Sequence, residues 1–435
     1  MELYYVNYYN QFHCIGPACE DTCCAVWGIE IDDKTYEKYK SCKGKWGERF
    51  AGSIDEEQCF HMKEDSKECI FLNDKHLCDI QAAFGEDMLC RTCKMFPRHM
   101  EDYGERREFM LSLACPEAAR MILFKTEPTT LYKRVKERRI PEENKVDEQL
   151  LAALLKLRES ILEILHKPDV NFSARTSMVL ALAHDANSRI RKKDWKALDA
   201  VIERYTREGA VGRFVRKLGE HMQCDQRECQ SEWGKNSDDC MKAPKGIQQQ
   251  MKKYLHMLEG LELLDEKWSA YLSETQRLLY EEETEESYEA LLKEFWTGKK
   301  KQGQIYENIA EYFIISYMVG AVFDSDAYTK VKFALYSLLI IRELYLARYK
   351  KNRAGGKAGL ENSDRVELAY WYSREVENSQ NNLDALDTVL EAHPEFSLEK
   401  LMSCLLANPM EALEEDQEMA DKVTSAPERN RRNMS

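Results

Sequence analysis

The chain has 435 residues, of which 43% are hydrophobic and 32% charged, so a globular fold of two or three domains is expected rather than disorder. Its formal net charge of −14 excludes a general nucleic-acid-binding surface, because phosphate contact needs a basic footprint. The first ten residues lack the features of a signal peptide, and no apolar stretch approaches the roughly 20 residues that span a bilayer. We therefore expect a cytoplasmic protein that does not insert into a membrane.

Residues 1–125 are predicted to form a loop-rich, metal-binding domain. Eleven of the 15 cysteines lie in the first 115 residues. Nine of them are candidate ligands: Cys14, Cys19, Cys23, Cys24, Cys69, Cys78, Cys90, Cys93 and Cys115. Structural disulfides are rare in a reducing cytosol, so thiolates at this density favour a metal ion or an iron–sulfur cluster.

The spacing of these cysteines is typical of ligand knuckles, in which a tight turn aims two sulfurs at one point. Cys90-x2-Cys93 and Cys19-x3-Cys23 both have such a spacing. Cys23 and Cys24 are adjacent and point apart in an extended chain, so they serve different sites or one of them is structural. Nine thiolates exceed one zinc site, which leaves either one cluster with spare cysteines or two sites.

Local signals for regular structure in this domain are weak. Trp27, Ile29 and Ile31 alternate as in a short strand, and Asp32 is placed to cap a helix that begins near Thr35. A second short helix is expected within 80–89. The histidines near the cysteines, His13, His76 and His99, are either ligands or histidines without a metal role, and we favour the second reading.

The pattern becomes helical after residue 145, so the fold class is mainly α. Asp147 is a predicted N-cap, and an apolar face runs from Leu150 to Leu165. Further helices are expected over 176–192, 195–219, 245–264, 266–297, 304–322, 327–350, 360–378 and 381–392. The predicted domains are a helical domain (126–300) and a C-terminal helical region (301–408), with a linker at 352–363 and a disordered tail at 409–435.

A smaller group of possible ligands lies within the helical part: His221, Cys224, Cys229 and Cys240. The residue types suit zinc, but the spacing fits no strong template, and an irregular exposed loop is the alternative. The radical-enzyme motif CxxxCxxC is absent, because Val26 stands where the third cysteine would be. The sequence contains no GxGxxG segment between a strand and a helix, so it predicts no dinucleotide-binding site.

The cysteine-rich part resembles the flagellin lysine-N-methylase family. The residues that carry the resemblance are CIGPACEDTCCAVWGI from Cys14, CIFLNDKHLCDIQAAFGEDMLCRTCKMFPR from Cys69, and LSLACPEAA from Leu111. The same block is similar to a wider group of zinc- or iron-chelating cysteine-cluster domains. A weaker likeness covers 304–350 and Tyr372–Glu375.

The resemblance implies an iron–sulfur protein, with a 4Fe-4S cluster or alternatively zinc, that transfers methyl from S-adenosylmethionine to lysine ε-amines of flagellin. Arg98 and Arg374 are candidates for the carboxylate of the methyl donor, because a guanidinium binds carboxylates bidentately; structural salt bridges are the alternative. The catalytic base cannot be chosen among the many Tyr, Asp and Glu residues. A non-catalytic metal-binding interaction module and a redox protein are the competing functions.

Overall fold

The structure is a computed structural model that describes residues 1–25, 28–136, 145–168, 170–224, 246–296 and 300–407. Cys229 and Cys240, the side chains of His221 and Cys224, and the predicted tail at 409–435 lie outside the described residues. Within these ranges the chain is mainly helical, which confirms the predicted fold class. None of the described helices is long and apolar enough to cross a membrane.

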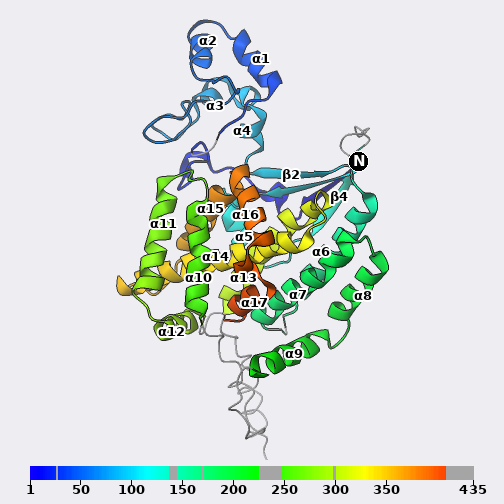
Figure 1. The fold of residues 1–435 in the computed structure, drawn as a ribbon. Helices are drawn as coiled ribbons and strands as arrows, with labels where there is room; N and C mark the ends of the chain where they lie inside the picture. Colours follow the sequence, from blue (N-terminus) through cyan, green and yellow to red (C-terminus); the bar gives the residue numbers. More distant parts are fainter. Residues whose placement is uncertain (26–27, 137–144, 169, 225–245, 297–299, 408–435) are drawn as a thin grey trace, which may run out of the picture.

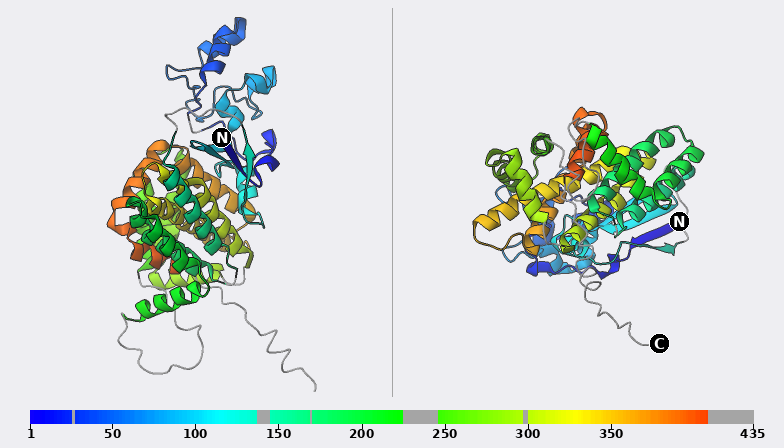
Figure 2. Two further views of the ribbon diagram at one scale, coloured as in Figure 1. Left: turned by 90° about the vertical axis from the view of Figure 1, so that its right-hand side faces the viewer. Right: turned by 90° about the horizontal axis from the view of Figure 1, so that it is seen from below.

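The cysteine-rich part contains only short helices. They are α1 (Asp33–Ser41), α2 (Gly44–Ala51), α3 (Asp79–Phe84), α4 (Arg91–Met95) and α5 (Pro116–Leu123). Asp32 caps α1 as predicted, because its carboxylate accepts the N–H of Thr35 at 3.1 Å. Figure 1 and Figure 2 show α1–α4 projecting from one end of the helical body, whereas α5 lies within that body.

The helical body is built around α14 (Ala327–Ala354), whose side chains are almost all buried between Val331 and Ala347. The surrounding helices are α6 (Glu148–Leu165), α7 (Phe172–Arg191), α8 (Trp195–Thr206), α9 (Ala210–Cys224), α10 (Ile247–Met257), α11 (Glu266–Gln276), α12 (Glu285–Trp296), α13 (Lys300–Tyr317), α15 (Asn362–Glu377), α16 (Gln380–Ala392) and α17 (Leu398–Leu406). A helix without a polar face has to be covered all round, which explains its central position. Asp147 caps α6 as predicted, accepting the N–H groups of Gln149 and Leu150.

The described residues also form a four-stranded sheet that the sequence did not predict. Its strands are β1 (Glu2–Val6), β2 (Arg98–Tyr103), β3 (Arg106–Leu111) and β4 (Leu131–Val135), in the spatial order β2-β3-β1-β4. β1 runs parallel to β3 and antiparallel to β4. Val6, Tyr103 and Leu111 are fully buried in the main core, so the sheet belongs to the helical body.

Two separate apolar cores divide the molecule. The main core extends from Val6 to Ala407 and joins the sheet to the helices. The second core lies in the projecting part, which we call the cysteine module (residues 28–93), and consists of Ile29, Ile31, Tyr39, Phe50, Phe60, Cys69, Phe71, Ile80, Leu89 and Cys90. Such a small core contributes little stability on its own, which makes metal binding a natural reinforcement.

Several predicted element boundaries were wrong. The helix expected over 195–219 is divided into α8 and α9 at Gly209, whose φ of +69° is unfavourable for other residues. The helix expected over 266–297 is interrupted before α12. The segment predicted as a linker is an ordered turn, because the Asn352 amide donates to the Gly359 carbonyl and the Asp364 carboxylate. The alternation at 27–31 gives no strand in the described residues, only a bridge between Glu30 and Cys59.

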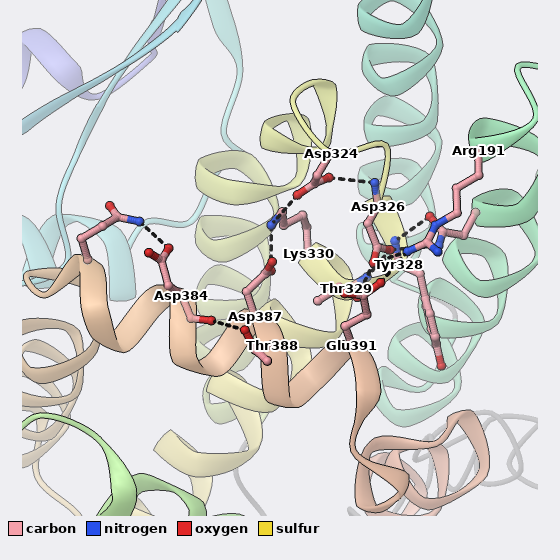
Figure 3. A network of polar contacts seen from close by, with 12 residues as sticks. Arg191, Asp324, Asp326, Tyr328, Thr329, Lys330, Asp384, Asp387, Thr388 and Glu391 are labelled. Carbon is pink, nitrogen blue, oxygen red and sulfur yellow. Dashed lines mark hydrogen bonds and ion pairs between the residues drawn. The ribbon is translucent and has the colours of Figure 1, made fainter.

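A polar network fixes the start of α14 between α7 and α16 (Figure 3). Asp326 caps α14 and accepts a hydrogen bond from Arg191 of α7 at 2.9 Å. Lys330 contacts Asp324 at 2.9 Å and Asp387 of α16 at 2.7 Å. Because these groups are partly buried, their pairing orients the helices that surround α14.

Candidate functional site

Four of the nine candidate cysteines lie in the cysteine module and a fifth, Cys24, packs against its core; we call these five the upper group: Cys24, Cys69, Cys78, Cys90 and Cys93. Cys69 and Cys90 are buried, and the other three are partly buried against the same core. The N–H of Cys69 donates to the carbonyl of Cys24 at 2.6 Å. Besides burial, the charges of Cys78 and Cys90 raise the pKa of Cys69, and the charge of Cys90 raises that of Cys78. The charges of Cys24 and Cys69 are among the causes that raise the pKa of Cys93.

Local structure in the upper group favours the thiolate form of Cys90. Cys78 and Cys90 are the N-cap residues of α3 and α4, where backbone N–H groups point away from the helix. Burial raises the pKa of Cys78, and the N–H groups of Ile80 and Gln81 oppose that rise. A hydrogen bond from the Cys93 thiol lowers the pKa of Cys90 and raises that of Cys93. This pair is the predicted Cys-x2-Cys knuckle.

The other four cysteines lie at the junction between the module and the helical body, and we call them the lower group: Cys14, Cys19, Cys23 and Cys115. Cys115 is the N-cap of α5, and burial raises its pKa to about 12. Cys19 and Cys23 both perturb the pKa of Cys115, and Cys14 and Cys23 perturb that of Cys19. Cys23 donates to Cys24, so these two residues form the boundary between the groups.

The donor sets of both groups fit a thiolate-bound metal ion or cluster. Each group supplies at least four soft sulfur ligands in a reduced state, since the described cysteines are thiols rather than disulfides. As the side chains lie, no three Cys, His, Asp or Glu residues in the described ranges are close enough together to hold an ion. Metal binding therefore requires the thiols of a group to rotate toward a common point. His13 and His76 are exposed and lie outside both groups.

Arg374 joins the helical body to the loop that carries Cys14, Cys19 and Cys23 of the lower group. Its guanidinium donates to the carboxylate of Asp21 at 2.9 Å and to the carbonyl of Ala114 at 3.0 Å. The hydroxyl of Tyr370 donates to the same carboxylate at 3.0 Å. The side chain of Arg374 is 3% exposed, and its Nη2 is buried with no hydrogen-bond partner in the described residues. Figure 1 shows α15 at the end of the body from which the cysteine module projects.

A second ion pair attaches the same loop to α5 of the helical body. The carboxylate of Glu20 accepts two hydrogen bonds from Arg120 of α5, at 2.6 Å and 2.5 Å. Both acidic residues between Cys19 and Cys23 therefore contact the helical body. The residues between these two cysteines thus set the spacing of the proposed ligands and also attach the loop to the helical body.

Arg98 lies elsewhere and has other partners. It is the first residue of β2, and its guanidinium lies over the rings of Tyr9 and Phe12, with 5.7 Å and 5.2 Å to the ring centroids. It also donates to the carbonyl of Phe12 at 3.5 Å. Arg98 and Arg374 share none of these partners, so the structure does not bring the two predicted donor contacts onto one group.

A cluster around Glu377, which sequence reasoning missed, lies one turn beyond Arg374. The hydroxyls of Tyr312 and Tyr317 on α13 donate to Oε2 of Glu377 at 2.7 Å and 2.6 Å. Oε1 is buried and has no hydrogen-bond partner in the described residues. Burial raises the pKa of Glu377, and the hydroxyls of Ser373, Tyr317 and Tyr312 oppose that rise, with a smaller opposing effect of His99 of β2. The sequence signal is only the spacing of Tyr370, Arg374 and Glu377 along one helix face.

The Glu377 cluster and the lower cysteine group adjoin each other. The N–H of Leu113 donates to the hydroxyl of Tyr312 at 3.1 Å, and the carbonyl of the next residue, Ala114, accepts from Arg374. Cys115 follows directly in the chain. The side of α15 that carries Arg374 and Glu377 therefore contacts the loop with Cys14, Cys19 and Cys23 as well as the segment that leads to Cys115.

Comparison with known proteins agrees with the resemblance seen in the sequence. The model of the FliB lysine N-methylase C-terminal domain matches residues 158–404. A lysine-N-methylase of Salmonella typhimurium is 31% identical over 126 residues, covering 26% of this chain and 30% of the relative. The flagellar biosynthetic protein FliU of Salmonella muenchen is also 31% identical over 126 residues, covering 72% of its length.

The chain thus matches less than a third of the length of the lysine-N-methylase relative. No solved structure matches the chain. The matched C-terminal domain includes α13 and α15, which carry Tyr312, Tyr317, Arg374 and Glu377. Because that domain covers more than half of the sequence, the chain belongs to the FliB lysine N-methylase family.

Proposed function

We propose that this protein is a lysine N-methyltransferase that moves a methyl group from S-adenosylmethionine to lysine ε-amines of flagellin. The observation that carries the proposal is the junction at α15. There the domain matched by the methylase family meets the cysteine-bearing loop through Arg374 and Asp21. The printed names of the relatives, a lysine-N-methylase and a flagellar biosynthetic protein, support the reaction and the kind of substrate.

The cofactor part of the proposal is an iron–sulfur cluster, with zinc as the alternative. The ligands would come from the upper group (Cys24, Cys69, Cys78, Cys90, Cys93) and the lower group (Cys14, Cys19, Cys23, Cys115). A bound cluster or ion would supply cross-links that stabilise the small core of the cysteine module. The upper group suits such a role because two of its members form part of that core.

The methyl donor would bind next to the lower group. Nη2 of Arg374 is a buried donor without a partner, and a carboxylate is the anion that a guanidinium accommodates best. Nη1 of Arg374 already donates to Asp21, so the carboxylate of the methyl donor would accept from the remaining Nη2. Arg98, which packs on Tyr9 and Phe12, would support the segment that leads to Cys14 rather than bind the donor.

Methyl transfer to lysine needs a neutral amine close to the sulfonium methyl carbon. A lysine in water has a pKa of about 10.4, so the site must remove a proton before the nitrogen can attack. The reacting atoms must also be held roughly 3–3.5 Å apart. A buried carboxylate on α15 is the kind of group that meets the first requirement.

The decisive experiment is co-expression of this chain with flagellin, followed by mass spectrometry of the flagellin lysines. We expect additions of about 14 Da on lysine, the mass change of one methylation. Flagellin that carries no such addition, in the presence of folded and metal-loaded protein, would contradict the proposed function. Anaerobic purification with iron, sulfide and zinc analysis tests the cofactor in the same preparation, and a colourless zinc protein would favour the zinc alternative.

A further inference from the structure

The Glu377 cluster combines groups from three elements that are far apart in the sequence. Tyr312 and Tyr317 come from α13, Glu377 from the last residue of α15, and His99 with Glu101 from the edge strand β2. Nε2 of His99 lies 2.5 Å from Oε1 of Glu101. The charge of His99 acts to lower the pKa of Glu377, and the charge of Glu101 adds to the burial that raises the pKa of Tyr317. The fold therefore places two phenols in contact with the Glu377 carboxylate, with the His99–Glu101 pair near enough to act on the cluster electrostatically.

Part of this set is reachable from solvent. The side chain of His99 is 47% exposed and that of Glu101 is 26% exposed. Glu377 and Tyr317 are partly buried, and Oε1 of Glu377 is shielded from solvent. The cluster thus combines an exposed pair with a buried carboxylate oxygen.

Glu377 is incompletely paired for a carboxylate in this environment. Oε2 accepts two hydrogen bonds, whereas Oε1 accepts none. The hydroxyl of Ser373, one turn earlier, lies close enough to lower the pKa of Glu377 as a hydrogen-bond donor does, but the two groups do not meet in hydrogen-bond geometry within the described residues. Leaving a buried charged oxygen unpaired is unfavourable, so a ligand with N–H donors would be bound well here.

A carboxylate between aromatic hydroxyls recognises a cation rather than an anion. Arg374 is one turn away, but its contacts go to Asp21 and Ala114 and not to Glu377. Glu377 forms no ion pair with Lys or Arg in the described part of the chain, and the guanidinium of Arg374 pairs with Asp21 instead. A primary ammonium group supplies both the positive charge and three N–H donors on a thin chain that can reach a recessed oxygen.

We propose that Glu377, held by Tyr312 and Tyr317, binds a primary alkylammonium group and removes its proton. Under the proposed function, on which this identification of the ligand rests, the group is the ε-ammonium of the substrate lysine. One N–H proton passes to Oε1 of Glu377, and the nitrogen lone pair then attacks the methyl carbon of a sulfonium donor. The new N–C bond forms as the S–C bond breaks, its electron pair stays on sulfur, and the product is a methylammonium and a thioether.

The position of the cluster agrees with this chemistry. The hydroxyl of Tyr312 accepts a hydrogen bond from the N–H of Leu113, and Cys115 of the lower group follows two residues later in the chain. Burial raises the pKa of Glu377, which makes the carboxylate a better proton acceptor for an amine. Glu377 thus lies on the same side of α15 as Arg374, the proposed contact for the donor.

Binding of n-butylammonium to the full-length protein tests the site independently of methyl transfer. NMR titration should show saturable binding to the wild type, at least tenfold weaker binding to Glu377→Gln, and wild-type binding to Glu367→Gln. Glu367 is a matched control, because it lies on the same helix and also accepts a tyrosine hydroxyl, from Tyr271 at 2.5 Å. Equal affinity of Glu377→Gln and wild type, or no saturable binding by the wild type, would overturn the proposal.

Flagellin methylation then separates this inference from the proposed function. If the wild type binds butylammonium through Glu377 but leaves flagellin unmodified, the ammonium site stands and the proposed function fails. If the wild type methylates flagellin, Glu377→Gln should lower kcat at least 100-fold at neutral pH, and its rate should rise more steeply with pH, since solvent must then deprotonate the lysine. Unchanged kcat and pH profile in Glu377→Gln would overturn the role as proton acceptor.

Discussion

Asp21 and Arg374 meet across 353 positions of sequence, and their 2.9 Å contact attaches the lower cysteine group to the helical body. Arg374 is almost fully buried, so the positive charge depends on this partner. Asp21→Asn should therefore destabilise the junction by about 3–5 kcal/mol, as expected when one member of a buried pair is lost. Urea unfolding measures the change.

Glu20→Gln is the matched control for that variant. Glu20 is adjacent to Asp21 and also pairs with an arginine, but its side chain is 41% exposed and Arg120 is 35% exposed. Exposed pairs typically contribute less than about 1 kcal/mol. If Glu20→Gln and Asp21→Asn have equal effects, the buried contact with Arg374 does not fix the junction.

The division of the cysteines into two groups predicts separable metal loading. Cys90→Ser should remove the metal of the upper group and leave that of the lower group, whereas Cys115→Ser should do the reverse. Cys42→Ser should change neither, because Cys42 belongs to neither group. Metal content per protein, measured after anaerobic purification, distinguishes two sites from one, and complete metal loss in both single variants would argue for a single shared site.

The two apolar cores predict that metal removal acts locally. Chelation should expose amides of the cysteine module to rapid hydrogen exchange while α14 and its neighbours stay protected, because the main core does not include the module. Hydrogen exchange with mass spectrometry, before and after chelation, measures both regions at once. Loss of protection throughout α14 would show that the helical body also needs the metal.

Glu375 makes stability depend on pH. Its carboxylate accepts the N–H groups of Leu264 and Asp265, and burial raises its pKa to about 7. The folded state thus binds a proton more tightly than the unfolded state does. The stabilisation from protonated Glu375 is complete below its unfolded pKa of about 4.5 and is lost as the pH rises through about 7.

Glu375→Gln should remove this dependence. The wild type should lose on the order of 1–3 kcal/mol relative to the variant between about pH 4.5 and 8. Urea unfolding at a series of pH values gives the free-energy difference directly. Parallel curves for the two proteins would mean that Glu375 has the same pKa in the folded and unfolded states.

The sequence predicted the helical class and several caps because those signals are local. Asp32 and Asp147 act through residues only two or three positions away, so a short window of sequence contains the whole interaction. The sheet was missed because β1 pairs with strands about 100 and 130 positions later, and its own residues, Glu2–Val6, form too short a run to indicate a strand.

The candidate site was predictable only in part for the same reason. The spacing of Cys90 and Cys93 encodes a knuckle, whereas the assignment of Cys23 and Cys24 to different groups depends on tertiary contacts. Glu377 has no distinctive sequence context. Its unpaired oxygen becomes visible only when α13, with Tyr312 and Tyr317, is packed beside α15.

The placement of β1 has a consequence for synthesis of the chain. β1 is made first, but its partners in β3 and β4 follow only at residues 106–109 and 131–135. Every cysteine of the upper group is synthesised before either partner strand. All ligands of the proposed upper metal site therefore precede β3 in the chain, whereas Cys115, which completes the lower group, follows it.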